Sequence, residues 1–385
     1  MTGLALVTHS TSPRGGMVHT LALAEALQAA GTPVHLVTQG DPAAGLHRHT
    51  TVPFTVLPAP DRSGTLTDRV YASIDALTAA LHDLSGAFDV LHAQDCIAAR
   101  AAARVRDAGA RVSVVRTVHH VDDFTTPALV ACQQAAIVEP DRVLVVSRQW
   151  ERILRDEYGV PATVVPNGVD AGRFGPVADG YREQLRRSIG AGDRFVLLGV
   201  GGIEPRKGTR HAFEALSRLY RSGTRPVLAI VGGHSFQDYA AYREEALAAL
   251  PGLGLELGRD VVLLGTVDDR TLSGWYRSAD ALLFPSVKEG WGLAVLEAMA
   301  ADLPVIASDL PVFREYLVDG RNALLPAVGD ASAIADAVAA VVADPELRER
   351  LRDGGRRTVP GYTWQRSAAA HRAVYDRLRA GEPVS

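Results

Sequence analysis

Apolar runs and amphipathic stretches alternate at the start of the chain and predict a strand, a helix and a second strand. An apolar run over residues 4–8 leads into a glycine-containing loop over residues 10–16. Residues 18–30 then carry apolar side chains at helical spacing, and a second apolar run follows over residues 34–38. This order is that of a βαβ unit.

The same order begins again in the middle of the chain. An apolar run over residues 195–200 precedes the loop GGIEPRKGT, a helical pattern follows over residues 211–221, and a further apolar run covers residues 227–231. The runs are continuous, which is typical of parallel strands covered by helices on both faces, so the pattern predicts an α/β protein of two doubly wound domains. Further strands are expected over residues 90–93, 112–118, 143–146, 163–165, 261–264, 281–284 and 305–307.

These patterns also set the expected domain limits. We expect an N-terminal domain over residues 1–168 and a C-terminal domain over residues 169–361, with the glycine-, proline- and aspartate-rich residues 168–193 as the linker region. An amphipathic stretch over residues 362–380 has no strand after it, so we expect residues 362–385 to return to the N-terminal domain as a helix. Ligands bind at the carboxyl ends of parallel strands, which predicts a site in the cleft between two facing sheets.

Composition and charge narrow the class of protein. The 385 residues are 47% hydrophobic and 22% charged, which is ordinary for a globular protein of two domains. The formal net charge of −4 argues against a nucleic-acid binder, which would carry a strongly basic face. One local arginine cluster has two interpretations. It can bind an acidic acceptor or a lipid headgroup, which would imply peripheral membrane contact, or it can be a solvated helix face. Its members are Arg100, Arg104, Arg106 and Arg111.

Cysteine usage and hydropathy indicate the compartment. Cys96 and Cys132 form no CxxC pair, and we expect both to be buried free thiols in a reducing environment. The first residues lack the pattern of a signal peptide, and no apolar run approaches the roughly 20 residues that span a bilayer. We therefore expect a cytoplasmic protein.

The segment EGWGLAVLEA, residues 289–298, carries the strongest chemical signal. Its two glycines, Gly290 and Gly292, let backbone N–H groups approach a ligand, and the helix after Leu293 adds the partial positive charge of its N-terminus, which suits a diphosphate. Glu297 lies one turn into that helix, where a carboxylate can accept from two ribose hydroxyls. Glu289 precedes the loop and can bind hydroxyls of a transferred sugar and stabilise positive charge on it. Two glutamates taken by themselves are more often surface residues or helix caps. The complete pattern of glutamates and glycines favours donor binding.

A second glycine-rich loop, residues 201–208, follows the first strand of the C-terminal half. Lys207 offers a cation to phosphate oxygens at the mouth of a helix. A glycine-rich loop or an isolated lysine is weak evidence alone, but the two loops in one domain together favour a phosphate site.

Three features of the N-terminal half are weaker signals of function. The loop around Gly15 and Gly16 lacks the GxGxxG spacing of dinucleotide enzymes, so we expect it to pack against a ligand held by the other domain. His119 ends an apolar strand, where it can contact a sugar hydroxyl or orient an acceptor, although a single histidine is often structural. Asn167 and Gly168 indicate a tight turn at the domain junction, which we interpret as a structural hinge.

Several motifs are absent from the sequence. It contains no Asp-x-Asp, no His-x-x-x-His and no P-loop, so we expect no metal and no cofactor besides the donor substrate. Neutralisation of the leaving group then falls to Lys207, the backbone N–H groups and the helix dipole.

Taken together, these motifs resemble the GT-B glycosyltransferases of family 4, retaining enzymes that use nucleotide-diphosphate sugars. The resemblance covers almost the whole chain and rests on PxxGGM at residues 13–17, TVH at 117–119, PNGVD at 166–170, EPRKG at 204–208, the E-x7-E pair and YTW at 362–364. It implies two Rossmann-like domains facing across a cleft, with the C-terminal helix returning to the first.

The resemblance also implies roles for single residues. Glu289 matches the contact to the transferred sugar, Glu297 the ribose ligand, and Lys207 the phosphate-binding lysine. His119 matches a contact to the donor sugar, and Gly16 approaches the donor phosphate or the acceptor. With the backbone loop, the expected donor-binding residues are Gly16, Arg206, Gly290, Trp291, Gly292, Leu293 and Glu297, and the catalytic ones are Glu289, Lys207 and His119.

The chain departs from the family pattern at one position. Family members often carry an arginine where this chain has Gly202, and losing it removes a fork-shaped cation for the diphosphate. Arg206 or Arg14 is expected to compensate.

The resulting hypothesis is metal-independent transfer of a hexose, glucose or mannose, from a UDP or GDP sugar to a hydroxyl acceptor. The acceptor is a small molecule, a glycan or a lipid-linked group. No carboxylate is placed as a covalent nucleophile, so retention by front-face displacement is expected. Two alternatives stay open, a nucleotide-sugar 2-epimerase of the same fold and a non-catalytic nucleotide-sugar-binding protein.

Overall fold

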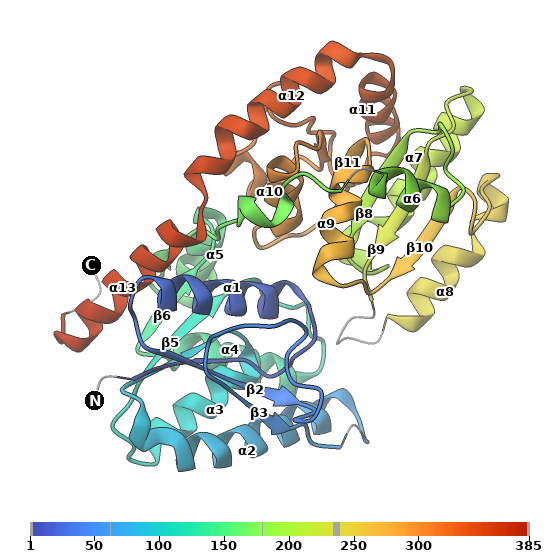
Figure 1. Ribbon diagram of the computed structural model, residues 1–385. Helices are drawn as coiled ribbons and strands as arrows, with labels where there is room; N and C mark the ends of the chain where they lie inside the picture. Colours follow the sequence, from blue (N-terminus) through green and yellow to red (C-terminus); the bar gives the residue numbers. More distant parts are fainter. Residues whose placement is uncertain (1–2, 62, 179, 234–238, 383–385) are drawn as a thin grey trace. The chain divides into compact units, whose positions relative to one another are not determined.

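The computed structural model describes residues 3–61, 63–178, 180–233 and 239–382, and the chain divides into two compact units. The N-terminal unit contains Met1–Gly168 and Trp364–Ser385, and the C-terminal unit contains Val169–Thr363. Each unit is a parallel sheet with helices on both faces, so the predicted fold class of two doubly wound α/β domains is confirmed (Figure 1).

The sheet of the N-terminal unit has seven parallel strands in the order β3-β2-β1-β4-β5-β6-β7. Its strands are β1 (Leu4–Val7), β2 (Val34–Gly40), β3 (Phe54–Pro58), β4 (Val90–Ala93), β5 (Ser113–Val118), β6 (Arg142–Val145) and β7 (Thr163–Val164). At the centre, Leu6 of β1 lies opposite Leu36 of β2 on one side and His92 of β4 on the other. The strand order reverses between β1 and β4, so the loops after these two strands diverge and leave a place for a ligand at this edge.

Helices cover both faces of this sheet. They are α1 (Gly15–Ala29), α2 (Leu66–Leu84), α3 (Cys96–Asp107), α4 (Pro127–Val138), α5 (Arg148–Tyr158) and α13 (Trp364–Arg379), with the 3₁₀ turn η1 (Ser85–Ala87) after α2. Side chains of α2, α3 and α4 share one apolar cluster with alternate residues of β1 and β4. The helix α13, red in Figure 1, packs beside α1, and its Tyr375 reaches His92 on the opposite face of β4.

The start of α1 differs from the sequence prediction. Residues 10–16 were expected to form a loop, but α1 begins at Gly15, so Gly15 and Gly16 form its first turn. A Cβ added at either glycine would meet no other atom within 4 Å, so neither neighbouring packing nor backbone strain requires glycine here. The first turn therefore presents bare backbone.

The C-terminal unit has five parallel strands in the order β10-β9-β8-β11-β12. These are β8 (Val196–Val200), β9 (Val227–Val231), β10 (Val261–Gly265), β11 (Ala281–Phe284) and β12 (Val305–Ala307). Its helices are α6 (Tyr181–Ser188), α7 (Thr209–Arg221), α8 (Ala240–Ala248), α9 (Asp269–Ser278), α10 (Leu293–Ala300), α11 (Ala331–Ala343) and α12 (Pro345–Thr358). Short 3₁₀ turns are η2 (Ala171–Phe174), η3 (Pro205–Lys207), η4 (Pro251–Leu253), η5 (Phe313–Glu315) and η6 (Val359–Gly361). The strands carry almost only apolar side chains, as a sheet covered on both faces requires.

The expected linker over residues 168–193 is wrong for most of its length. This segment contains η2 and α6, and α6 packs on α9 of the C-terminal unit. The contact is close because Gly274 of α9 lacks a side chain: a Cβ there would lie 2.5 Å from the ring of Tyr181. The two points where the chain changes unit lie together, since the Val169 N–H donates to the Tyr362 carbonyl at 3.0 Å.

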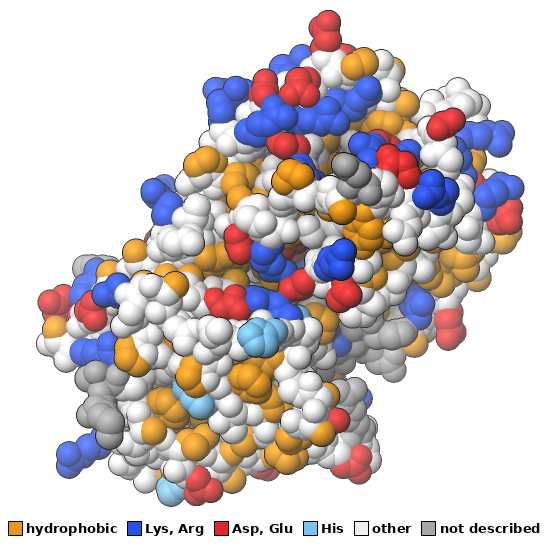
Figure 2. All heavy atoms as spheres, in the orientation of Figure 1, with side chains coloured by type: hydrophobic (Ala, Val, Ile, Leu, Met, Phe, Trp, Pro, Cys, Tyr) orange, Lys and Arg blue, Asp and Glu red, His pale blue; other side chains and the backbone are white. Residues whose placement is uncertain are grey.

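Charged side chains on the described surface are mostly paired with opposite charges. In the arginine cluster of the N-terminal unit, Arg100 pairs with Glu139, Arg104 with Asp75 and Arg106 with Asp141. Figure 2 shows the same mixture of charges over α12, where Arg356 pairs with Glu349 and Asp353. This pairing favours the solvated-face interpretation of the arginines. The two cysteines are free as expected, but only Cys132 is buried, and Cys96 is partly exposed.

None of the helices in the described part of the chain combines the length and the apolar character needed to cross a membrane.

Candidate functional site

Two loops at the carboxyl edge of the C-terminal sheet form the candidate donor site. One follows β8 and ends at Gly208, and the other follows β11 and ends at Gly292. Because β8 and β11 are neighbouring parallel strands, both loops emerge at the same edge. The Val287 N–H donates to the Arg206 carbonyl at 2.9 Å, and a Cβ at Gly208 would lie 1.9 Å from the Pro285 carbonyl oxygen. The loops are therefore packed backbone against backbone.

A charge cluster joins these loops through their side chains. Lys207 Nζ lies 2.7 Å and Arg206 Nη1 3.1 Å from the same oxygen, Oε1 of Glu289. The Glu289 side chain is only 7% exposed, so its charge is balanced by these two cations rather than by water. Burial alone would raise the pKa of Glu289, but Lys207 and Arg206 outweigh burial and hold the pKa below its usual value. Burial lowers the pKa of Lys207, and Glu289 offsets only part of that shift.

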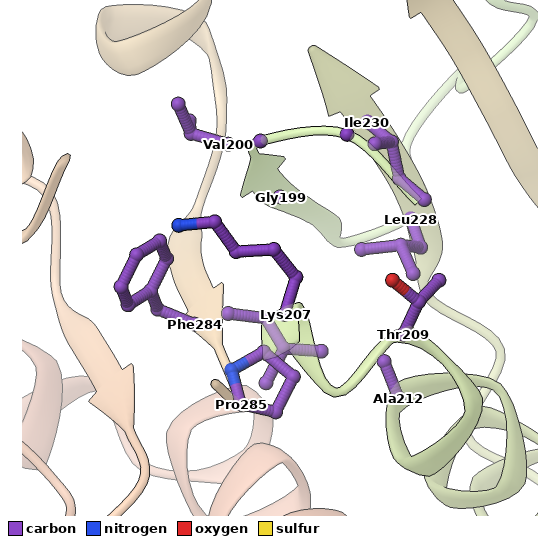
Figure 3. Close-up of a pocket in the computed structure, with 12 residues that line it drawn as sticks. Gly199, Val200, Lys207, Thr209, Ala212, Leu228, Ile230, Phe284 and Pro285 are labelled. Carbon is purple, nitrogen blue, oxygen red and sulfur yellow. The ribbon is translucent and has the colours of Figure 1, made fainter. Parts of the chain in front are cut away.

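An aromatic ring supports the lysine from the side. In Figure 3 the Lys207 side chain extends past the ring of Phe284, and Nζ lies 4.6 Å from the ring centroid. Such a contact stabilises an ammonium group that has lost part of its hydration. A pocket of about 30 Å³ lies beside it, lined by Gly199, Val200, Gly201, Gly202, Lys207, Thr209, Ala212, Leu228, Ile230, Leu283, Phe284 and Pro285. That volume has room for about two water molecules, so the pocket by itself is too small for a nucleotide sugar and can form only part of a site.

The segment from Gly290 to Leu293 leads into α10 and packs on buried aromatic side chains. Gly292 adopts φ = 96° as the N-cap of α10, and a Cβ there would lie 2.5 Å from the Phe313 ring. The Trp291 indole is 3% exposed and stacks on Tyr316 at 5.0 Å, while Tyr316 Oη donates to the Trp291 carbonyl at 2.9 Å. Trp291 thus contributes backbone to this surface, and its side chain lies in the core beneath the loop.

Glu297 lies one turn into α10 and has a partner that the sequence reasoning missed. Tyr276, on α9 and fully buried, donates from Oη to Glu297 Oε2 at 2.7 Å. Burial raises the pKa of Glu297, although the hydrogen bond from Tyr276 and the charge of Arg173 act in the opposite direction. Nothing in the local pattern distinguishes Tyr276 from an ordinary core aromatic of an amphipathic helix, so no sequence signal could have found it.

Close approach of two loops explains the glycine at position 202. A Cβ at Gly202 would lie 2.5 Å from the Gly233 carbonyl oxygen, and a Cβ at Gly232 would lie 2.4 Å from the Gly201 carbonyl carbon. The loops after β8 and β9 therefore leave no room for an arginine at 202. Arg206 lies next to Glu289, as Lys207 does, and compensation by Arg206 or Arg14 for the missing arginine stays a prediction.

The remaining expected residues, His119 and Gly16, belong to the N-terminal unit. His119 follows β5, and its Nε2 lies 3.2 Å from Gln94 Oε1 at the end of β4. Burial lowers the pKa of His119 to about 3, with His120 and Arg116 adding to the effect, so the ring is neutral at physiological pH. Gly16 is in the first turn of α1, where its carbonyl accepts from Thr20 Oγ1 at 2.7 Å.

A second pair at this edge was also missed by the sequence reasoning. Asp95 caps α3 by accepting from the Ala98 N–H at 2.8 Å and lies 3.0 Å from His9 Nδ1, after β1. Burial alone would raise the pKa of Asp95, but His9 and backbone N–H groups outweigh it and lower the pKa. An aspartate after a strand and before a helix is a recognisable N-cap signal. Nothing in the sequence indicates that His9 is its partner.

Within the described residues, no three His, Cys, Asp or Glu side chains are grouped so that they could hold a metal ion. Metal independence and the absence of a cofactor stay predictions.

Comparisons with known proteins identify the family. Residues 181–358 match the family described as "Glycosyl transferases group 1", and residues 13–173 match "Glycosyltransferase Family 4". The chain is 30% identical to the phosphatidyl-myo-inositol mannosyltransferase of Mycobacterium leprae over 94% of this chain and 93% of that protein. It is 28% identical to the D-inositol 3-phosphate glycosyltransferase of Jonesia denitrificans over 99% of this chain and 95% of that protein.

A solved structure agrees in fold. The Anabaena protein HepE, crystallised with UDP and glucose, superposes with a TM-score of 0.81 at 18% identity and covers 99% of this chain and 100% of its own. With two family matches that together span both units and a relative matched along nearly its full length, the chain belongs to the family 4 glycosyltransferases of the GT-B fold and is a glycosyltransferase.

Proposed function

We propose that this glycosyltransferase transfers a hexose, with retention at the anomeric carbon, from a UDP or GDP sugar to a hydroxyl of an inositol phosphate or phosphatidylinositol acceptor. The observation that carries the proposal is the cluster of Lys207, Arg206 and Glu289 at the mouths of β8 and β11. It combines two cations for a diphosphate with a carboxylate for a sugar, next to the N-terminus of an eight-residue helix.

Each group has a defined part in the proposed reaction. The bond between C1 of the sugar and the diphosphate oxygen breaks while the acceptor oxygen bonds C1 on the same face. The acceptor proton passes to the leaving phosphate oxygen. Lys207 and Arg206 stabilise the charge that develops on that phosphate, and Glu289 stabilises the positive charge on the sugar. Glu297 binds the ribose, His119 contacts the sugar, and Gly16 contacts the donor phosphate or the acceptor.

The choice of donor and acceptor follows the relatives and one solved structure. Two relatives are named for inositol 3-phosphate and phosphatidyl-myo-inositol, one of them as a mannosyltransferase. HepE was crystallised with UDP and glucose. UDP-glucose and GDP-mannose are therefore the first donors to test, and inositol phosphates and phosphatidylinositol the first acceptors.

The test is a transfer assay on the purified chain. Each donor is incubated with inositol 3-phosphate or with phosphatidylinositol vesicles, and released UDP or GDP and the mass of the product are measured. The anomeric configuration of the product is then read by proton NMR. We expect one donor and acceptor pair to give retained product, and Lys207→Ala and Glu289→Gln to lower turnover by about a hundredfold or more.

A matched control variant is Arg221→Ala, which removes an exposed cation from the far end of α7 and is expected to leave turnover unchanged. Wild-type turnover in both Lys207→Ala and Glu289→Gln would refute the proposal. Conversion of the donor sugar without acceptor would instead establish an isomerase, and donor binding without any nucleotide release would establish a binding protein.

A further inference from the structure

The ring of His119 lies in a row of buried polar side chains within the N-terminal unit. Gln94 Oε1 lies 3.2 Å from His119 Nε2, and the His19 ring meets the His119 ring edge to face at 4.6 Å between centroids. His19 in turn places Nδ1 2.9 Å from Asn167 Oδ1. Gln94, His19 and Asn167 are 3%, 0% and 4% exposed, so this row is part of the core.

Each amide oxygen in this row determines which ring nitrogen carries the proton. In the amide orientations of the structure, Gln94 Oε1 and Asn167 Oδ1 face the two rings. A carbonyl oxygen only accepts, so with these orientations His119 Nε2 donates to Gln94 and His19 Nδ1 donates to Asn167. In neutral His119 the other nitrogen, Nδ1, then bears the lone pair. Within the described part of the chain Nδ1 has no hydrogen-bond partner, so it is the nitrogen that can accept from a substrate hydroxyl.

The backbone holds Gln94 firmly in this position. Its N–H donates to the Val7 carbonyl at 2.9 Å, which continues the pairing of β4 with β1. Two residues earlier on β4, His92 makes an equivalent bond across to Thr117 of β5 at 2.8 Å, two residues before His119. Side chains two residues apart point to the same face of a strand, so these are two successive cross-strand pairs.

Two atoms of the row, Gln94 Nε2 and His19 Nε2, are buried without a hydrogen-bond partner among the described residues. A buried amide left half-satisfied costs stability. Gln39 Oε1 is buried without a partner in the same way, so what sets Gln94 apart is its contact with an imidazole: its amide oxygen lies 3.2 Å from His119 Nε2.

We propose that Gln94 is a positioning residue that fixes His119 as the Nε2–H tautomer, while His19, itself held by Asn167, packs edge to face against the ring. His119 thereby presents a hydrogen-bond acceptor, and not a donor, to a hydroxyl of the transferred sugar. This assignment rests on the proposed function of His119. It also gives Asn167, interpreted from the sequence as a hinge residue, a contact inside the N-terminal unit.

Charged and titratable groups reach His119 from every element around it. They are His19 on α1, His92 on β4, Asp95 at the start of α3, Arg116 on β5, His120 in the same loop and His371 on α13. Asp95 favours a protonated His119 ring, and His120, Arg116 and His371 oppose it. A new carboxylate at position 94 would add to Asp95 and favour the protonated ring.

The first test reads the tautomer directly in the full-length protein. Imidazole ¹⁵N shifts are recorded on histidine-labelled enzyme, and the His119 signals are assigned by their loss in His119→Ala. We expect the Nε2–H tautomer in the wild type and a mixture of tautomers in Gln94→Leu. A wild-type ring protonated at Nδ1, or an unchanged ring in Gln94→Leu, would overturn the proposal.

The second test uses transfer kinetics. We expect Gln94→Leu to lower kcat by about tenfold, with little change in donor KM, as for loss of a residue that orients a functional imidazole. In Gln94→Glu the carboxylate holds a proton on His119, so kcat should fall as pH falls through the raised pKa and recover at higher pH. Gln39→Leu, which removes a buried glutamine of β2 that donates to the Ser73 carbonyl of α2, should keep the wild-type kcat and pH profile.

The outcomes separate this inference from the proposed function. If Lys207→Ala and His119→Ala abolish transfer but both Gln94 variants keep the wild-type profile, only the positioning role fails. If His119→Ala transfers normally, the role of His119 in the proposed function fails. If the wild type transfers no sugar at all, the ¹⁵N measurement still decides the tautomer.

Discussion

At the scale of single residues, two glutamates of the C-terminal unit, Glu289 buried and Glu297 half-buried, differ in their partners. Glu289 faces two cations, which hold its pKa below the usual value. Glu297 faces a tyrosine hydroxyl, and burial raises its pKa. A carboxylate between cations stays charged, so it can stabilise the positive charge that develops on the transferred sugar. A carboxylate held by one neutral donor keeps acceptor positions for the hydroxyls of a ribose.

The hydrogen bond from Tyr276 should therefore matter for nucleotide binding. In Tyr276→Phe the half-buried Glu297 loses its donor and its fixed orientation, which we expect to weaken UDP or GDP binding by about 1 kcal/mol, or roughly fivefold. Isothermal titration calorimetry of the nucleotide measures this. The matched variant is Tyr220→Phe, which removes an equivalent bond to Asp260 just before the amino end of β10. Equal losses of nucleotide affinity in the two variants would contradict the assignment.

At the scale of elements, glycines fix how the site loops pack. The loops after β8, β9 and β11 approach one another backbone to backbone at Gly202, Gly208 and Gly232. This packing brings Arg206 and Lys207 to Glu289, and it leaves no room for a larger side chain at position 202.

The contact at Gly208 can be tested against the glycine at the other end of the same helix. Gly208 and Gly223 both have left-handed φ, +65° and +91°, but only a Cβ at Gly208 meets another atom, the Pro285 carbonyl oxygen. We expect Gly208→Ala to lower the free energy of unfolding by about 3 kcal/mol or more, from strain plus overlap. Gly223→Ala should cost about 1 kcal/mol, from strain alone. Urea unfolding of both variants measures the difference, and equal costs would contradict the close contact.

At the scale of the whole molecule, the chain begins and ends in the same unit. The helix α13 contributes Trp364, His371 and Tyr375 to a core that already holds His19 and His92. The N-terminal unit is therefore complete only after the C-terminal unit has been made. Its core is unusually rich in histidine, which ties its stability to pH.

This histidine core predicts acid sensitivity. Burial lowers the pKa of His119 to about 3 and that of His371 to about 4, and it lowers the pKa of His19 and His92 well below the usual 6.5. As pH falls below 6.5, the unfolded chain binds protons that the folded protein does not. Stability is therefore greatest above 6.5 and is lost toward pH 4, by at most about 1.4 kcal/mol per pH unit for each histidine.

Thermal unfolding between pH 7.5 and pH 5 measures this slope. We expect a steep fall in unfolding temperature for the wild type, a shallower one for His371→Gln, and the wild-type slope for His82→Gln, which changes an exposed histidine of α2. A slope unchanged by His371→Gln would show that buried histidines do not set the acid limit.

Much of the fold and part of the candidate site could be predicted from the sequence. Two successive βαβ patterns predict the two parallel sheets, and the motifs around Lys207 and Glu289 stand directly after apolar runs, so their place at strand ends follows from covalent order. Tyr276, Gln94 and His19 could not be found in this way. Each looks locally like an ordinary core residue, and its partner comes from another element.

What the sequence by itself determined is the order of elements, the class of sheet and the segments that stand at strand ends, because hydrophobic period and neighbouring glycines act over a few residues. The tertiary structure decided which side chains meet. Lys207 and Glu289 are 82 residues apart, His19 and Asn167 are 148 apart, and His92 and Tyr375 are 283 apart. It also decided that Gly202 has no room for a side chain. Contacts between distant segments depend on how whole elements pack, and no local pattern contains that information.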